Sequence, residues 1–256
     1  MEWRKRTAGR RWASMFRSDA MRKILHAAIC TAVLFTVALP AAPALGVDVD
    51  KIRSGRKYYP EGTPTRAIQD LDDMLDDFKV APKGQTLTAK EEEHNRETKQ
   101  NIIHGTFDIR ELSKQSLAKH WKQRTTQEQK DFVQVLTDLL EEKALFSKEQ
   151  SAAKSKSGGK YYVVYRGHKF YDKAKTRAFV RTKVVVPSEK IDITLNYRLK
   201  KKGDEWKIYD VIVDEASLVD NYRYQFNSII TKHGYPDLVG RMTKKLNEIK
   251  AKRNKS

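Results

Sequence analysis

Residues 191–199 read IDITLNYRL, and apolar and polar side chains alternate along the whole stretch. A period of two is typical of a β-strand with one buried face and one face in water. A shift of one residue would exchange the two faces, so the pattern also fixes which side chains point inward. We therefore expect a strand here, with Ile193, Leu195 and Tyr197 on its apolar face.

The segments on both sides of this strand also have strand character. Residues 161–166 are aromatic and β-branched, residues 178–186 alternate in the same way, and residues 206–213 form a further apolar run. Turn residues separate them at Pro187-Ser188 and at Lys202-Gly203-Asp204. Short turns between consecutive strands predict an antiparallel meander of about four strands.

Farther outward the period changes to that of helices. Capping signals mark the expected helix starts, and a glycine follows the fifth helix. These signals are Thr63-Pro64, Thr88-x-x-Glu91, Asp108-x-x-Glu111, Thr125-x-x-Glu128, Ser217-x-x-Asp220 and Gly234. Leu238, Met242, Leu246 and Ile249 mark a sixth helix. The order of elements predicts an α+β fold, in which a curved sheet is wrapped by about six helices that enclose an apolar pocket.

The N-terminal part has the pattern of a secretory signal peptide. Residues 24–39 are apolar, Arg22 and Lys23 precede them, and the small residues Ala42 and Ala44 follow. The apolar run is about 16 residues long, shorter than the ~20 that a spanning helix needs. We expect a signal peptide within residues 21–46, with Met21 as its start and cleavage near residues 44–46. An uncleaved anchor is the alternative.

This assignment divides the chain into three parts. Residues 1–46 are an upstream extension and signal peptide, residues 47–62 a flexible leader, and residues 63–256 a single domain. The whole chain carries a formal charge of +18, and removal of residues 1–46 leaves 43 basic and 31 acidic residues, or +12. The single cysteine, Cys30, lies in the signal segment, so the exported chain fits an oxidising compartment, and the periplasm is the expected location.

The basic residues gather on the strands. Residues 160–207 contain 14 basic and 5 acidic residues, mostly at outward positions. With Tyr161, Tyr162 and Tyr165 they could form a nucleic-acid face. They could equally protect sheet edges from aggregation, or attract anionic lipid or an acidic partner.

Common catalytic and metal motifs are absent from the sequence. It has no P-loop, no G-x-S-x-G elbow and no H-E-x-x-H motif. Asp210 and Asp214, near the end of the last long strand, could act as a base in a small cavity enzyme. A structural role for Asp210 and a solvated Asp214 are the simpler interpretation. The acidic face of the first helix (Asp70, Asp72, Asp73, Asp76 and Asp77) is interpreted as solvated rather than metal-binding.

Two stretches resemble the MlaC-type family, also called toluene-tolerance auxiliary proteins. The first comprises FDIREL at 107–112 and LAKHW at 117–121, and the second comprises WKIYDV at 206–211 and SLVDNYRYQF at 217–226. The similarity extends over about residues 64–250. The family usually has glycine where this chain has Ala118 and Ala216, which would strain the backbone if φ is positive there.

The resemblance implies a periplasmic phospholipid carrier that helps to maintain outer-membrane lipid asymmetry. It implies a strongly curved sheet, NTF2-like in part, with no enzyme activity, no metal and no cofactor. The implied partners are phospholipid, an inner-membrane MCE-type ABC lipid transporter and an outer-membrane lipoprotein–porin complex, with no role for nucleic acid.

Inward periodicity selects candidate residues for the pocket. The expected lining residues are Leu136, Leu140, Val180, Val184, Ile193, Leu195, Tyr197 and Phe226. Asn221, Tyr222, Arg223 and Gln225 are expected at the rim or in a structural role. The competing functions are a small NTF2-like cavity enzyme, another exported hydrophobic-ligand binder, and a basic nucleic-acid module.

Overall fold

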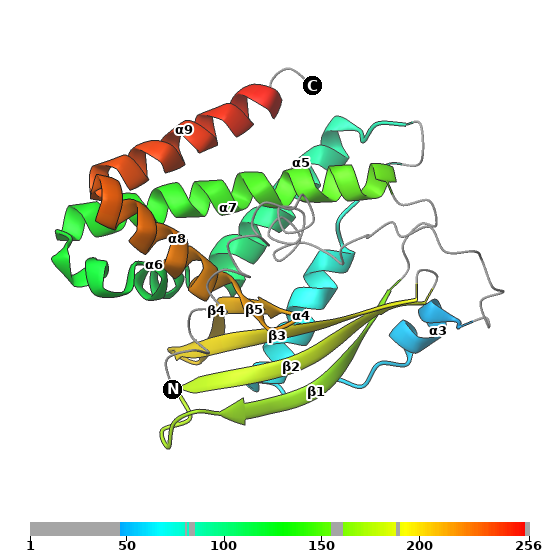
Figure 1. The fold of residues 1–256 in the computed structure, drawn as a ribbon. Helices are drawn as coiled ribbons and strands as arrows, with labels where there is room; N and C mark the ends of the chain where they lie inside the picture. The colour runs from blue at the N-terminus through cyan, green and yellow to red at the C-terminus, as the bar shows by residue number, and fades with distance from the viewer. Residues whose placement is uncertain (1–46, 80, 82–84, 155–160, 188–189, 254–256) are drawn as a thin grey trace.

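The structure is a computed structural model that describes residues 47–79, 81, 85–154, 161–187 and 190–253. The expected signal peptide at 21–46 lies outside these residues, as does the turn residue Ser188. The α+β fold class is confirmed, with an antiparallel sheet in the order β1-β2-β3-β4-β5 (Figure 1). None of the described helices combines the length and apolar character required to cross a membrane.

The strands follow the expected meander. Their bounds are β1 (Tyr162–Phe170), β2 (Arg177–Val186), β3 (Ile191–Lys202), β4 (Glu205–Val213) and the short β5 (Ala216–Ser217). β2 and β3 pair without interruption from Arg177 opposite Lys200 to Val186 opposite Ile191. Irregularities occur in β1 between Tyr165 and His168, and in the β3–β4 ladder after Arg198. The sequence did not indicate β5, because two residues are too few for a visible period.

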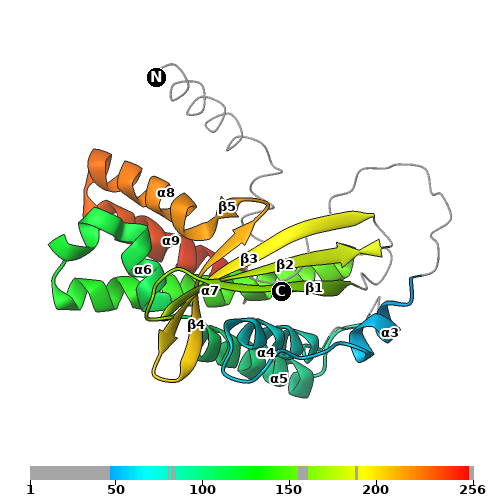
Figure 2. The same ribbon diagram turned by 90° about the horizontal axis from the view of Figure 1, so that it is seen from below.

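The helices lie before and after the strands in the chain. They are α3 (Val49–Ser54), α4 (Pro64–Asp76), α5 (Ala89–Gln100), the π-helix η1 (Asn101–Thr106), α6 (Ile109–Leu117), the 3₁₀ helix η2 (Ala118–Gln123), α7 (Thr126–Lys154), α8 (Leu218–His233) and α9 (Tyr235–Arg253). α7 is the longest of these helices and continues to Lys154. In Figure 2, α4 and α5 lie on one side of the sheet, and α6 and α8 lie beside its end. The long α7 runs from this end along the sheet (Figure 1).

Side-chain caps explain where the helices begin. Thr63, Thr88, Asp108 and Ser217 each accept a hydrogen bond from the backbone N–H three residues later. At α5 the reciprocal bond from Thr88 N to Glu91 completes the expected capping box. α8 ends at Gly234, whose φ of 85° suits a residue without a Cβ.

Glu111 ties the start of α6 to the sheet. It is 4% exposed, and its carboxylate accepts hydrogen bonds from Lys200 Nζ at 2.9 Å and Arg177 Nη2 at 3.0 Å. Burial opposes ionisation of Glu111, but the bonds from Lys200, Gln115 and Arg177 outweigh it and lower its pKa to about 2. The carboxylate therefore stays charged and holds two cations of β2 and β3.

The segment 47–62 differs from the flexible leader that the sequence suggested. It forms α3 and then runs along α4, where Tyr59 N donates to Gln69 Oε1 at 2.7 Å. Gln69 Nε2 donates in return to Lys57 O at 2.9 Å. Gln69 is fully buried, so water cannot supply hydrogen bonds to its side-chain amide, and these two backbone groups supply them instead.

Ala118 has the strained backbone that its departure from the family pattern suggested. It follows α6 with φ 48° and ψ −116°, a region that favours glycine. Ala216 lies in β5 and is not among the residues with positive φ. The two alanine-for-glycine departures therefore have different consequences.

We predict that Ala118→Gly raises the free energy of unfolding by about 1–2 kcal/mol, because the Cβ causes the strain. Ala216→Gly is the matched control and should lower stability by about 0.5–1 kcal/mol, since glycine only adds chain entropy in a strand. Urea denaturation of the two variants measures both changes. A stability loss in Ala118→Gly would contradict the strain at this position.

Candidate functional site

The inner face of the sheet is the face that packs against α4. On this face Val180 lies opposite Tyr197, and Val184 lies opposite Ile193. These four residues are between 0% and 8% exposed. Leu195 lies between Ile193 and Tyr197 on β3 and is only half-buried. The alternation seen in the sequence therefore produces one continuous apolar surface across β2 and β3.

The remaining candidate lining residues come from the helices. Leu136 and Leu140 of α7 are each 1% exposed, and Phe226 of α8 is 5% exposed. All three belong to the same hydrophobic cluster as the inner face, and Leu195 packs against that cluster. The tertiary structure thus unites all eight candidates in one apolar core. That they line a lipid pocket stays a prediction.

The predicted motif on α8 makes contacts with other helices. Tyr222 stacks on Phe226 with ring centroids 5.2 Å apart, and burial raises the pKa of Tyr222 to about 12. Arg223 Nε donates to Gln115 O of α6 at 3.0 Å. Asn221 is buried and Gln225 is half-buried. Arg223 therefore joins α8 to α6.

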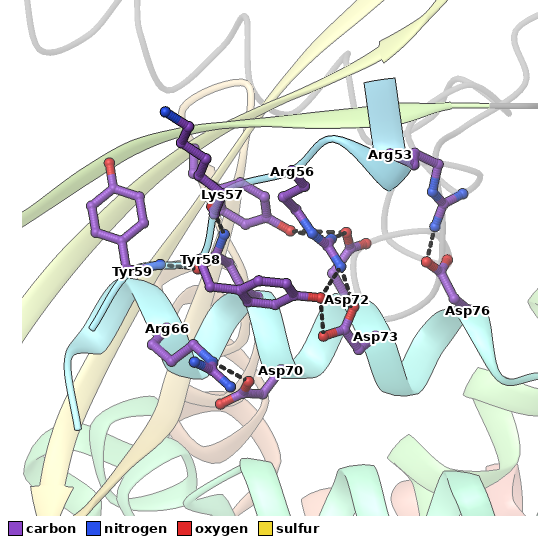
Figure 3. Close-up of polar contacts among 12 residues, drawn as sticks. Arg53, Arg56, Lys57, Tyr58, Tyr59, Arg66, Asp70, Asp72, Asp73 and Asp76 are labelled. Atoms are coloured by element: carbon purple, nitrogen blue, oxygen red, sulfur yellow. Dashed lines mark hydrogen bonds and ion pairs between the residues drawn. The ribbon is translucent and has the colours of Figure 1, made fainter. Parts of the chain in front are cut away.

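A polar cluster lies beside the inner face, where the segment 47–62 meets α4 and β1 (Figure 3). Arg56 Nη1 donates to Asp72 Oδ2 at 2.7 Å, and Arg56 also pairs with Asp73. Arg53 pairs with Asp76 and lies 4.9 Å from the ring centroid of Tyr161. Two arginines from the N-terminal segment thus pair with three carboxylates of α4.

This cluster corrects the interpretation of the acidic face as solvated at Asp72, whereas Asp76 and Asp77 are exposed as expected. Asp72 is 8% exposed, and it accepts hydrogen bonds from Arg56 and from Tyr165 Oη at 2.8 Å. Burial and the charge of Asp72 raise the pKa of Tyr165 far above its usual value, so Tyr165 donates as a neutral hydroxyl. A buried carboxylate needs such partners, because an unpaired charge is costly away from water.

The spacing of charged residues in the sequence is a signal for this cluster, although the apolar periodicity that predicts the helices does not include it. Arg53 and Arg56 are three residues apart, and Asp72, Asp73 and Asp76 have a similar spacing on the next helix. Residues three or four apart share a helix face, so these aspartates of α4 form one acidic surface, which Arg53 of α3 and Arg56 just beyond α3 reach. Residues 47–62 are mostly polar, which favoured a flexible leader over a segment that pairs with the acidic helix.

Asp210 holds the start of α8 against the sheet. Its Oδ1 accepts from Val219 N at 3.0 Å, and its Oδ2 accepts from Ser217 Oγ at 2.7 Å and Arg198 Nη1 at 2.9 Å. Burial raises the pKa of Asp210, although these bonds oppose the effect. Both oxygens are occupied by structural donors, as the simpler interpretation of Asp210 expected. Asp214 is exposed and accepts from Thr194 N.

The histidines have separate polar contacts. His94 lies against Asp77, His104 against Glu141, His120 against Asn227 and His168 against Thr65. Within the described ranges, no group of three or more His, Cys, Asp or Glu side chains could hold a metal ion. The cluster of Figure 3 is therefore an ion-pair network in which carboxylates bind arginines.

Comparison with known proteins identifies the family. The structure is similar to that of a phospholipid-binding protein from Ralstonia solanacearum, solved in complex with a phospholipid, with a TM-score of 0.54 and 20% identity. This match covers 73% of the present chain and 98% of the other, and at this identity it establishes the fold. A search among curated proteins gave no match. The family model for the MlaC protein matches residues 72–244, and the chain therefore belongs to the MlaC family.

Proposed function

We propose that this protein binds phospholipid against the inner face of its sheet and carries it between two membranes. The observation that carries this proposal is the continuous apolar core formed by β2, β3, α7 and α8 in a chain of the MlaC family. A relative with the same fold is described as phospholipid-binding and was solved with a phospholipid, which supports the same ligand here.

The energetics of such a carrier depend on the reference state. Burying about 30 methylenes of a phospholipid at ~0.8 kcal/mol each is worth roughly 24 kcal/mol relative to water. Non-covalent affinities saturate near about 18–21 kcal/mol, so free lipid in water is not the state from which the carrier takes its ligand. The carrier exchanges lipid with a bilayer, which is also apolar, and the exchange can be close to neutral.

A nearly neutral exchange needs partners to give it direction. We propose that the protein works in the periplasm, receiving and delivering lipid at an inner-membrane MCE-type ABC transporter and an outer-membrane lipoprotein–porin complex. ATP hydrolysis in the transporter would supply the free energy. The protein itself has no catalytic role in this scheme and needs no cofactor besides the bound lipid.

Export can be tested directly. We predict that the mature protein begins near residues 44–46 and is found in the periplasmic fraction, because residues 21–46 have the layout of a cleaved signal peptide. N-terminal sequencing of the fractionated protein measures this. A membrane-retained protein that begins before residue 24 would contradict the prediction.

The proposed non-catalytic role predicts that Asp210→Asn lowers the stability of the fold without changing lipid binding. The new amide nitrogen would face two donors, Arg198 and Ser217, so the free energy of unfolding should fall by about 1–3 kcal/mol. Phospholipid bound per folded molecule should stay unchanged. Denaturant melts and lipid extraction on the same preparation measure both quantities.

Asp214→Asn is the matched control for Asp210→Asn. Asp214 is exposed with φ 45°, and asparagine tolerates that backbone conformation, so stability should change by less than about 0.5 kcal/mol. If Asp210→Asn left stability and lipid content intact but abolished lipid transfer, a catalytic or gating role would replace the structural one.

Lipid binding is tested by solvent extraction and mass spectrometry of the purified protein. We predict that phospholipid co-purifies with the wild type, and that Leu195→Arg lowers the bound lipid at least about tenfold. A guanidinium in the path of an acyl chain loses its hydration without gaining a partner. Circular dichroism on the same samples measures folding.

Two further variants make the result decisive. Thr194→Arg places the same side chain on the outer face, where Thr194 is exposed, and should leave the bound lipid unchanged. Leu195→Trp fills space without adding charge, so it should displace lipid even if Leu195→Arg fails to fold. Wild-type protein without phospholipid, or folded Leu195 variants that keep all of it, would contradict the proposed site.

A further inference from the structure

The outer face of the sheet is the side opposite α4. It is turned toward the viewer in Figure 1, and among the described elements no helix crosses it over β1 and β2. Val164 on this face is 39% exposed, and Tyr171 at the end of β1 is 53% exposed. Val164 and Tyr171 thus expose large side chains to solvent on an accessible surface.

The part of the outer face nearest the helices has its cations paired. Arg177 and Lys200 bind Glu111 of α6, and Arg198 binds Asp210. Each of these carboxylates is at most 4% exposed, so each pair includes a buried acid. The positive charge of this part is therefore neutralised within the protein.

The part over β1 and β2 has cations without such partners. Arg166, Lys169 and Arg181 are all exposed, and none of them forms an ion pair within the part of the chain that the structure describes. Arg181 Nη2 donates to Arg166 O at 3.4 Å, which brings the two arginines together at the irregularity of β1. Lys183, farther along β2, pairs with Asp192.

Aromatic and apolar side chains lie among these cations. The rings of Tyr171 and Phe179 are 6.2 Å apart, and Phe179 lies opposite Lys169. Tyr162 and Val164 occupy the outward positions at the other end of β1. We call these residues the outer patch, which comprises Tyr162, Val164, Arg166, Lys169, Tyr171, Phe179 and Arg181.

This combination matches the surface of an anionic bilayer. Basic side chains near such a surface are attracted by lipid phosphates, and tyrosine rings sit at the level of the head groups. Long basic side chains can also lay their methylenes on apolar surface while their charges reach phosphate. Alternation along β1 and β2 brings several of these side chains to the same face of the sheet.

We propose that the outer patch docks this protein on the anionic phospholipid head groups of a membrane. The apolar inner face stays on the other side of the sheet, so docking and lipid carriage use opposite surfaces. Docking rests on the proposed function for its purpose, since both proposed partner complexes lie in membranes and docking would hold the carrier beside them. It is nevertheless measured separately from lipid carriage.

Sedimentation of the exported protein with vesicles tests the proposal. The vesicles are phosphatidylcholine alone, or phosphatidylcholine mixed with phosphatidylglycerol. We expect the wild type to bind only the mixed vesicles and to release them as salt is raised. The triple variant Arg166→Gln/Lys169→Gln/Arg181→Gln should bind about 100-fold more weakly, at about fivefold for each charge removed.

A second triple variant controls for total charge. Lys130, Lys232 and Lys244 are exposed on α7, α8 and α9, and their replacement by Gln removes the same charge elsewhere. We expect this control to weaken vesicle binding less than about fivefold. Equal loss in the two triple variants, equal binding to both vesicle types, or full binding by the outer-patch variant would each overturn the proposal.

Two further outcomes separate related explanations. If the outer patch binds an acidic protein but neither vesicle, the bilayer is the wrong partner and the proposal fails. Phospholipid that co-purifies with the outer-patch variant is measured on the same sample, and we expect it to be retained. Loss of lipid from the wild type would count against the proposed function, whereas vesicle binding would still decide the docking proposal.

Discussion

The uninterrupted pairing of β2 with β3 is the constraint on which the rest of the structure depends. Because side chains alternate along both strands, the register that sets Val180 opposite Tyr197 also sets Val184 opposite Ile193 on the same, inner face. A slip of one residue would send lysines and arginines into the core. The same register therefore creates both the apolar inner face proposed for lipid and the basic outer face proposed for docking.

Buried acids divide the outer face into two functional parts. Glu111 and Asp210 come from the start of α6 and from β4, and each binds cations of the neighbouring strands. In the part near these two acids, their ion pairs and hydrogen bonds hold α6 and α8 against the sheet. Beyond them, Arg166, Lys169 and Arg181 of β1 and β2 form no ion pair with the described residues, and their charges are the ones proposed to meet an external partner. For the proposed carrier, such a surface would hold the protein at the membranes in which its proposed partner complexes lie.

The N-terminal segment shows the same principle on the other side of the molecule. Arg53 and Arg56 cover an acidic helix face, and Asp72 is buried with Tyr165 beside the apolar core. All of segment 47–62 precedes the part of the chain that matches the family model, which begins at residue 72. Besides the ion pairs, the buried Val49 of α3 and the hydrogen bonds to Gln69 hold this segment against the domain.

The sequence by itself determined the strands and helices that are marked by patterns of nearby residues. The alternation of residues 191–199, the caps at Thr88 and Ser217, and the apolar stripe of α9 each depend on neighbours within a few residues. It could also name the eight apolar candidates of the site, because inward positions follow from the period. Only the tertiary structure decided which charges meet. The partners of Asp72, Glu111 and Asp210 lie on other elements of the fold, and a charge pattern in sequence does not reveal whether water or a distant cation will surround it.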